Sequence, residues 1–156
     1  MSFTVTDPFA LFDQWLAEAT ATEPNDPNAM SLATLDANGM LSNRIVLLKG
    51  HDTDGFRFFT NYESRKGQAL AANPRAAALF HWKTLGRQVR VEGAIERLTA
   101  EQSQAYYDTR PRGSRIGAWA SLQSQALPER SSLQDRIDAF EAQFEGQETF
   151  PKPDYW

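Results

Sequence analysis

The chain has 156 residues, of which 41% are hydrophobic and 12% aromatic, enough for one packed domain and too many for a disordered polypeptide. It contains no cysteine, which excludes disulfides, thiolate metal sites and cysteine nucleophiles. No stretch approaches the ~20 apolar residues of a membrane span, and residues 1–8 lack the basic and apolar regions of a signal peptide. We therefore expect a cytoplasmic protein with one domain, residues 1–156.

The net charge of −4 is unevenly distributed along the chain. Residues 1–39 contain six acids and no Lys or Arg, whereas residues 40–119 contain thirteen of the sixteen basic residues and seven acids. A basic middle segment in an acidic protein favours a local anion-binding site over a nucleic-acid-binding face. The alternative is a set of solvated charges scattered over the surface.

The first half of the chain predicts one helix followed by antiparallel strands. Asp7 and Pro8 are typical of a helix start, and the helical spacing of the next apolar residues predicts one buried face: Phe9, Phe12, Trp15, Leu16 and Ala19. The expected strands and turns are a strand at 30–35, a turn at 36–39, a strand at 41–49, a turn at 52–55 and a strand at 56–60. Four consecutive apolar residues, 45–48, indicate that the second strand is buried on both faces, with Arg44 and Lys49 projecting from its ends toward a cleft. The alternative is that the two cations only solubilise the strand ends.

The second half alternates between helices and strands. Ser64 is expected to cap a helix that ends before Asn73 and Pro74, and Thr99 with Gln102 forms a capping box for another. The remaining expected elements are strands at 76–82 and 88–98, a short apolar turn at 116–120, a helix capped by Ser131 or Ser132, and an extended tail from Phe150. Helices outside five meandering strands predict an α+β fold built on an antiparallel barrel, although five strands leave the closure of that barrel unexplained.

Few side chains suggest catalysis by the protein itself. His51 and His81 are isolated from other metal-ligand residue types, so no metal site is expected. The chain has no G-x-S-x-G elbow, no G-x-G-x-x-G fingerprint and no Walker loop. We therefore expect an organic cofactor to supply the reactivity.

Two clusters of cations indicate phosphate binding. Arg65 and Lys66 fall in the first turn of the helix capped by Ser64, where the helix dipole disfavours cations unless an anion binds there. Tyr106 and Arg110 are four residues apart and would share a helix face, with Ser114 just beyond a proline turn. The alternative for Arg65 and Lys66 is that both side chains extend into water.

Five segments, in order and with matching spacing, resemble pyridoxine/pyridoxamine 5'-phosphate oxidases, which are flavin mononucleotide (FMN)-binding split barrels. The segments are residues 44–49 (RIVLLK), 59–67 (FTNYESRKG), 87–93 (RQVRVEG), 114–120 (SRIGAWA) and 123–125 (QSQ). The resemblance runs from about Asp7 to Trp156. It implies a split barrel with peripheral helices, and a homodimer with FMN at the subunit interface.

The resemblance also implies a reaction and a site. Pyridoxamine or pyridoxine 5'-phosphate would be oxidised to pyridoxal 5'-phosphate, with a hydride passing to the flavin, O2 as acceptor and H2O2 as product. The implied FMN-binding residues are Arg44, Ile45, Val46, Leu47, Leu48, Lys49, Phe59, Thr60, Arg65, Lys66, Gln88, Gln123 and Ser124, the last two reaching over from the other subunit. The implied substrate-binding residues are Lys49, Tyr106, Arg110 and Ser114.

The chain departs from the family pattern at its ends. Family members continue beyond a position like Trp156 with strands that close the barrel and with residues that bind the flavin and the substrate ring. We therefore expect a chain truncated at its C-terminus, with weakened flavin binding. Two alternatives stay open: a non-catalytic protein that binds FMN or a vitamin B6 phosphate, and a dimeric interaction module without a cofactor.

Overall fold

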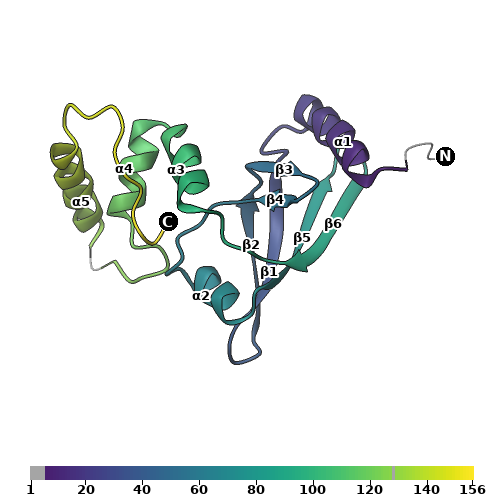
Figure 1. Ribbon diagram of the computed structural model, residues 1–156, viewed down its shortest axis with the longest axis horizontal. Helices are drawn as coiled ribbons and strands as arrows, with labels where there is room; N and C mark the ends of the chain where they lie inside the picture. Colours follow the sequence, from purple (N-terminus) through teal and green to yellow (C-terminus); the bar gives the residue numbers. More distant parts are fainter. Residues whose placement is uncertain (1–5, 128) are drawn as a thin grey trace. The chain divides into compact units, whose positions relative to one another are not determined.

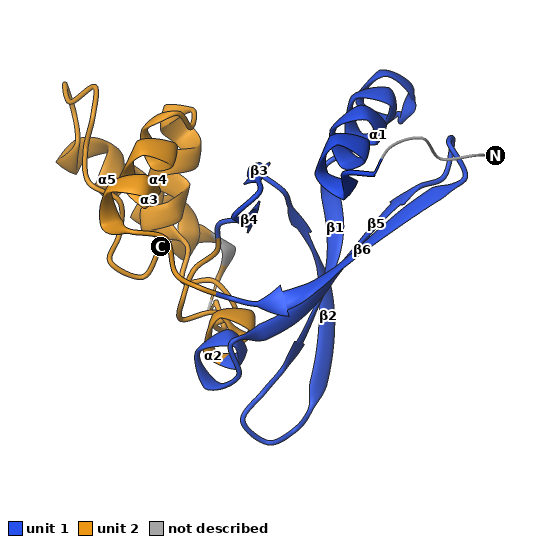
Figure 2. Cartoon of the chain, turned by 45° about the vertical axis from the view of Figure 1, so that its right-hand side comes forward, with its two compact units in different colours: residues 1–59, 69–95 blue, residues 60–68, 96–156 orange. Residues whose placement is uncertain are grey.

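The computed structural model describes residues 6–127 and 129–156 and divides the chain into two compact units (Figures 1 and 2). Unit 1 consists of Met1–Phe59 and Ala69–Ile95, and unit 2 of Thr60–Gln68 and Glu96–Trp156. Helix α2 (Arg65–Ala72) carries one boundary between the units. The single domain expected from the sequence stays a prediction.

Unit 1 is built on an antiparallel sheet of four strands in the order β2-β1-β5-β6. The strands are β1 (Ala29–Leu35), β2 (Leu41–Leu47), β5 (Arg75–Trp82) and β6 (Arg87–Ala94). The β1–β2 hairpin forms at the expected turn, where Asp36 Oδ1 accepts hydrogen bonds from the amides of Asn38 and Met40. Gly39 closes that turn with a φ of 77°, which a residue with a Cβ rarely adopts. A separate two-stranded sheet pairs β3 (Gly50–Asp52) with β4 (Gly55–Arg57).

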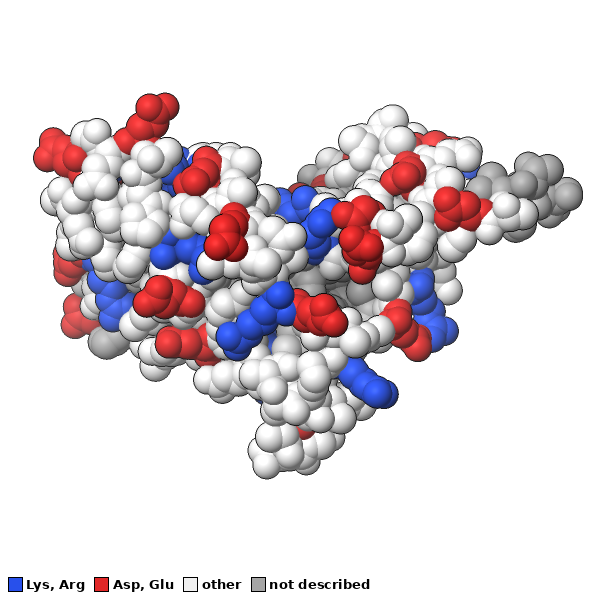
Figure 3. Space-filling model, viewed as in Figure 1, with Lys and Arg blue, Asp and Glu red and all other residues white. Residues whose placement is uncertain are grey.

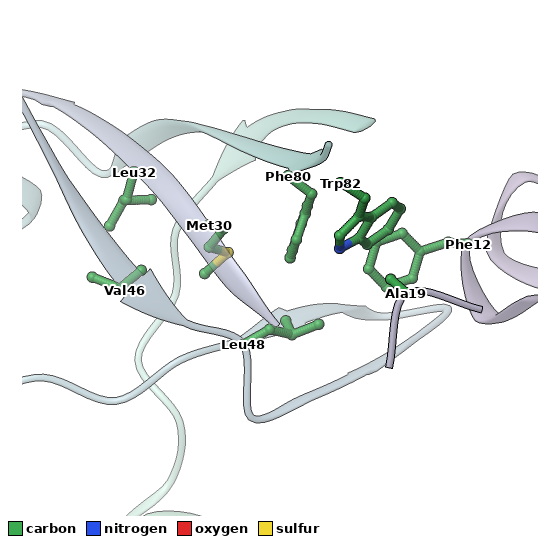
Figure 4. Packing of buried hydrophobic residues seen from close by; sticks show 8 residues of the cluster. All are labelled: Phe12, Ala19, Met30, Leu32, Val46, Leu48, Phe80 and Trp82. Carbon is green, nitrogen blue, oxygen red and sulfur yellow. The ribbon is translucent and has the colours of Figure 1, made fainter. Parts of the chain in front are cut away.

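The core of unit 1 lies between this sheet and helix α1 (Pro8–Thr22). Asp7 caps α1 through a 2.9 Å hydrogen bond from the Phe9 amide, as the sequence predicts. Figure 4 shows Phe12 of α1 turned toward Phe80 and Trp82 of β5. The ring centroid of Phe12 lies 5.1 Å from that of Phe80 and 5.9 Å from that of Trp82. Every second residue of β1 (Met30, Leu32 and Thr34) is buried on this face.

The opposite face of the sheet is open within unit 1, which corrects the expectation that β2 is buried on both faces. Leu41 is 76% exposed and Ile45 is 65% exposed, whereas Val46 points into the core. A shallow groove on this face is lined mainly by small side chains, including Ala33, Ala77 and Ala94. The run of apolar residues 45–48 therefore alternates between the core and an exposed surface, as the period of a strand requires.

Unit 2 is mainly helical and contains α3 (Ala100–Asp108), α4 (Arg112–Ala120) and α5 (Arg130–Gln143). The capping box of Thr99 and Gln102 forms as predicted at the start of α3. Tyr107 of α3 is fully buried and its hydroxyl donates a 2.8 Å hydrogen bond to the Arg115 carbonyl of α4. The extended tail returns over the helices, with the Phe150 ring stacked 4.3 Å from that of Phe144.

Several element boundaries differ from the sequence predictions. The expected turn at 116–120 is part of α4, because Pro111 starts a helix whose Ile116 and Ala120 become fully buried. Strand β6 ends at Ala94 rather than at Leu98, β2 ends at Leu47, and the strand expected to reach Thr60 ends at Arg57. Helix α5 has Glu129 at its N-cap position, without a side-chain cap hydrogen bond, two or three residues before the expected serines.

Candidate functional site

The start of α2 has the capped geometry that the sequence predicts. Ser64 is fully buried, its Oγ accepts a 3.3 Å hydrogen bond from the Gly67 amide, and its carbonyl accepts a 2.9 Å bond from the Gln68 amide. Lys66 folds back over this helix end, with Nζ 3.2 Å from Ser64 Oγ and 2.8 Å from Gln123 Oε1. The side chain of Arg65 is exposed. Two cations therefore lie at the positive end of a helix dipole, an arrangement that an anion bound there would stabilise.

Gly67 lets the first turn of α2 approach the preceding loop more closely than any other residue would. A Cβ at this position would lie 2.3 Å from the Tyr62 carbonyl oxygen and 2.7 Å from the Asn61 carbonyl oxygen. Both are backbone atoms, so a larger residue would displace the helix start. The close approach fixes where Arg65 and Lys66 leave the backbone.

Thr60 and Gln123–Ser124 are further residues of the predicted flavin site in unit 2. Thr60 Oγ1 is buried without a hydrogen-bond partner, and such a group costs about 1–3 kcal/mol unless a ligand or water satisfies it. Gln123 contacts Lys66 within one chain, as described above. Ser124 has a φ of 65°, in the left-handed region that non-glycine residues seldom occupy. Strained backbone of this kind is typical of ligand-binding turns.

The predicted flavin residues of unit 1 lie on both faces of its sheet. Arg44 is opposite Leu32 on the core face, where its Nη1 donates to the Leu32 carbonyl at 2.8 Å and to Thr34 Oγ1 at 2.9 Å. Arg44 thus lies within the strand instead of projecting from its end. Gln88 pairs with His81 on the opposite, exposed face. The other members of the set are Ile45 (exposed), Val46 and Leu48 (buried), Leu47 and Phe59 (half-buried) and Lys49 (exposed).

The predicted substrate-phosphate residues of unit 2 come together around one indole ring. Tyr106 stacks on Trp156 with centroids 6.0 Å apart and an interplanar angle of 1°, and the Arg110 guanidinium lies 5.0 Å from the centroid of the same indole. Arg110 Nη1 is buried without a hydrogen-bond partner. Ser114 is exposed in the first turn of α4, with its amide 2.9 Å from the Pro111 carbonyl oxygen.

The three neighbouring arginines differ in how their charge is compensated. Arg112 forms a 3.1 Å ion pair with Glu141 and donates to the Phe144 and Gln147 carbonyls, so it fixes the end of α5. Among the described residues, Arg110 and Arg115 have no such carboxylate partner, and Nε and Nη1 of Arg115 are buried and unpaired. The predicted substrate-phosphate cluster, through Arg110, therefore retains positive charge that no carboxylate of the described residues compensates.

Burial raises the pKa of two tyrosines in unit 2. The pKa of Tyr107 rises to about 12, because desolvation of the phenolate outweighs the opposing effect of the positive charges of Arg115 and Arg110. Burial also raises the pKa of Tyr155, which donates to the Ala118 carbonyl at 3.1 Å. Both phenols stay protonated at neutral pH and act as hydrogen-bond donors.

The described surface carries charges of both signs and offers no cluster of metal ligands. On the face drawn in Figure 3, basic and acidic side chains are interspersed. Within residues 6–127 and 129–156, no group of three His, Asp or Glu side chains could hold a metal ion, and no helix is long and apolar enough to cross a membrane.

Sequence reasoning identified the cations but missed Trp156, which lies in a tail without periodicity. Nothing in the local sequence indicates that Trp156 contacts Tyr106 and Arg110, because the contact is made across about 50 residues of chain. The single signal is compositional: a tryptophan in a proline-rich segment has no helix or strand of its own to pack in.

Comparison with known proteins identifies the family. The family model described as "Pyridoxamine 5'-phosphate oxidase" matches residues 16–144, which extend over both units. The chain belongs to the pyridoxamine 5'-phosphate oxidase family. It is 57% identical over 150 residues to a pyridoxine/pyridoxamine 5'-phosphate oxidase of Cupriavidus taiwanensis, covering 96% of this chain and 70% of that protein. It is 53% identical over 155 residues to the same-named protein of Granulibacter bethesdensis, covering 96% and 72%.

Solved structures support the split-barrel fold of this oxidase family. PhzG from Burkholderia lata, crystallised with tetrahydrophenazine-1-carboxylic acid, matches with a TM-score of 0.88 and 27% identity over 97% of this chain and 74% of that one. A pyridoxamine 5'-phosphate oxidase-related, FMN-binding protein from Nostoc punctiforme matches in fold, with a TM-score of 0.65 and 19% identity over 86% and 73%. The α+β, antiparallel split-barrel class expected from the sequence is confirmed.

Proposed function

We propose that this protein is an FMN-dependent oxidase that converts pyridoxamine or pyridoxine 5'-phosphate to pyridoxal 5'-phosphate, with O2 as acceptor and H2O2 as product; the amine substrate also takes up water and releases ammonia. The observation that carries the proposal is Arg110, a cation with a buried, unpaired Nη1 and no carboxylate partner among the described residues. A phosphate would supply the missing acceptor. The relatives named as pyridoxine/pyridoxamine 5'-phosphate oxidases give the substrate class.

The residues at the start of α2, together with Thr60, fit an FMN molecule. Arg65, Lys66 and the helix N-terminus would hold the phosphate, and the unpaired Thr60 hydroxyl would donate to the bound molecule. When bound, FMN supplies the redox chemistry, by accepting a hydride and passing electrons to dioxygen. The chain itself contributes binding, orientation and positive charge near the two phosphates.

The second phosphate cluster would hold the substrate. Tyr106, Arg110 and Ser114 would donate hydrogen bonds to the phosphate oxygens, and Lys49 would add a further positive charge. PhzG is described with a ring compound that bears a carboxylic acid, so the fold alone does not select a phosphorylated substrate. Substrate choice is therefore assigned to these side chains.

The location of Arg44 and Gln88 on opposite faces of the four-stranded sheet favours a homodimer. The two side chains leave opposite faces of one sheet, and one flavin cannot contact both faces of that sheet at once. In a homodimer, one flavin would contact Arg44 of one chain and Gln88 of its partner, which resolves this conflict. The exposed apolar side chains of Leu41 and Ile45 give a partner chain an apolar surface to cover. The cytoplasmic location expected from the sequence belongs to the same proposal.

The proposal is tested by adding FMN to the purified protein and measuring peroxide formation from pyridoxamine 5'-phosphate. Flavin retention with peroxide production supports the oxidase. Retention without peroxide indicates the non-catalytic flavin-binding protein, and a protein that stays colourless with excess FMN indicates the interaction module without a cofactor.

The double variant Arg65→Glu/Lys66→Glu tests the flavin-phosphate site directly. It should lose FMN retention, because two cations that face the phosphate become two anions, while far-UV circular dichroism stays unchanged. The matched control Arg75→Glu/Lys83→Glu makes the same charge change at two exposed residues of unit 1 and should retain FMN. Equal losses in both double variants would attribute the effect to net charge and remove the assignment of Arg65 and Lys66.

A further inference from the structure

Trp156 contacts two members of the proposed substrate-phosphate cluster, Tyr106 and Arg110. Its indole is parallel to the Tyr106 ring, and the Arg110 guanidinium lies over it at 5.0 Å. The edge of the same indole packs on Tyr107, with centroids 5.1 Å apart and an interplanar angle of 70°. Trp156 is only 9% exposed, so its ring is held between these partners.

The tail that carries Trp156 is fixed to unit 2 at several points along its length. Gln104 of α3 forms hydrogen bonds with the backbone on both sides of Pro151. Its Nε2 donates to the Phe150 carbonyl at 3.3 Å, and its Oε1 accepts from the Lys152 amide at 2.9 Å. Trp119 Nε1 donates to the Pro151 carbonyl at 3.0 Å. The Tyr155 carbonyl accepts a 2.6 Å bond from the Tyr62 amide. These bonds set the position of the indole before any ligand arrives.

An aromatic ring is a better group than a carboxylate for orienting an arginine that binds phosphate. A carboxylate would orient Arg110 but would also occupy its N–H groups and neutralise its charge. An indole face attracts the cation through its quadrupole and leaves the N–H groups at the guanidinium edge available. The unpaired Nη1 of Arg110 is consistent with this division of roles.

We propose that Trp156 is a positioning residue of the substrate-phosphate site, which holds Tyr106 and Arg110 in the geometry that binds a phosphorylated ligand. The inference rests on the proposed function for the identity of the ligand. Trp156 would support the substrate-phosphate cluster without contacting the phosphate. Because the anchor acts on binding, its loss changes ligand affinity and leaves the redox step alone.

The test compares Trp156→Ala, Trp156→Phe and the wild-type protein. Direct titration with pyridoxal 5'-phosphate measures affinity, and steady-state oxidation of pyridoxamine 5'-phosphate separates KM from kcat. We expect Trp156→Ala to weaken binding and raise KM about tenfold, as expected for the loss of a desolvated cation–π contact of roughly 1–2 kcal/mol. FMN retention and kcat should stay within about twofold of wild type, and Trp156→Phe should restore most of the affinity because it keeps an aromatic face.

Trp15→Ala serves as a matched control, because Trp15 carries an arginine contact of the same kind in unit 1, with Arg87 at 4.8 Å. The affinity of the Trp15→Ala variant for pyridoxal 5'-phosphate should match that of the wild-type protein. Unchanged affinity in Trp156→Ala, or a parallel loss of affinity, kcat and FMN that phenylalanine does not rescue, overturns the inference. Wild-type protein that binds pyridoxal 5'-phosphate without turnover refutes the oxidase and leaves the binding test of Trp156 valid, whereas wild-type protein that does not bind it refutes both.

Discussion

The substitution Gly67→Ala tests whether the close approach at the start of α2 is needed for both stability and flavin binding. The added Cβ would lie 2.3 Å from the Tyr62 carbonyl oxygen, and that oxygen belongs to the backbone and cannot rotate away. Overpacking of this kind costs about 3 kcal/mol at the upper end of its range, and the better helix propensity of alanine returns about 1 kcal/mol. The net loss of unfolding free energy is therefore about 2 kcal/mol, or roughly 4–8 °C in Tm for a chain of this size.

Thermal unfolding and FMN titration measure the two consequences of Gly67→Ala. The displaced helix start should also weaken FMN binding about tenfold, since 1.4 kcal/mol corresponds to that factor. The matched control is Gly117→Ala in α4, where a Cβ would meet nothing within 4 Å. This control should stabilise the protein by about 0.5–1 kcal/mol, because alanine loses less conformational freedom than glycine. Equal stability and equal FMN affinity of Gly67→Ala and wild type would refute the argument.

Three further predictions follow from single residues. The pKa of Tyr107 is raised to about 12, so the protonated phenol stabilises the fold fully below the ordinary tyrosine pKa of about 10, and this stabilisation is lost as the pH rises to 12. The unfolding free energy should fall by up to about 2–3 kcal/mol between pH 10 and 12. The fall should be smaller in Tyr107→Phe. Thr60→Val should raise the unfolding free energy of the FMN-free protein by about 1 kcal/mol, because it removes an unpaired buried hydroxyl, yet weaken FMN binding in a fluorescence titration. Phe12→Ala should cost about 3–5 kcal/mol in chemical denaturation, since Phe12 packs against Phe80 and Trp82 in the core of unit 1.

Local features of the structure could be predicted where the signal is itself local. The caps at Asp7, Ser64 and Thr99 each depend on one side chain and amides two or three residues away, so the sequence alone specifies them. The hairpin turn that ends at Gly39 was predictable for the same reason.

Features that depend on distant contacts could not be predicted. The short apolar stretch at 116–120 was expected to be a turn, and it is helical because Ile116 and Ala120 are buried in unit 2. The hydrophobic run in β2 suggested burial on both faces, since hydrophobicity does not reveal that Ile45 faces outward. The cations of the candidate site were visible in the sequence, but the indole that supports Tyr106 and Arg110 was not.

The opposite orientations of Arg44 and Gln88 also bear on genetic complementation. If each flavin draws Arg44 from one chain and Gln88 from its partner, chains carrying Arg44→Ala and chains carrying Gln88→Ala are individually defective at every site. Random mixing of the two would produce hybrid dimers in which one site combines both native side chains and the other has neither. About a quarter of all sites would then regain full function, as two-fold symmetry dictates.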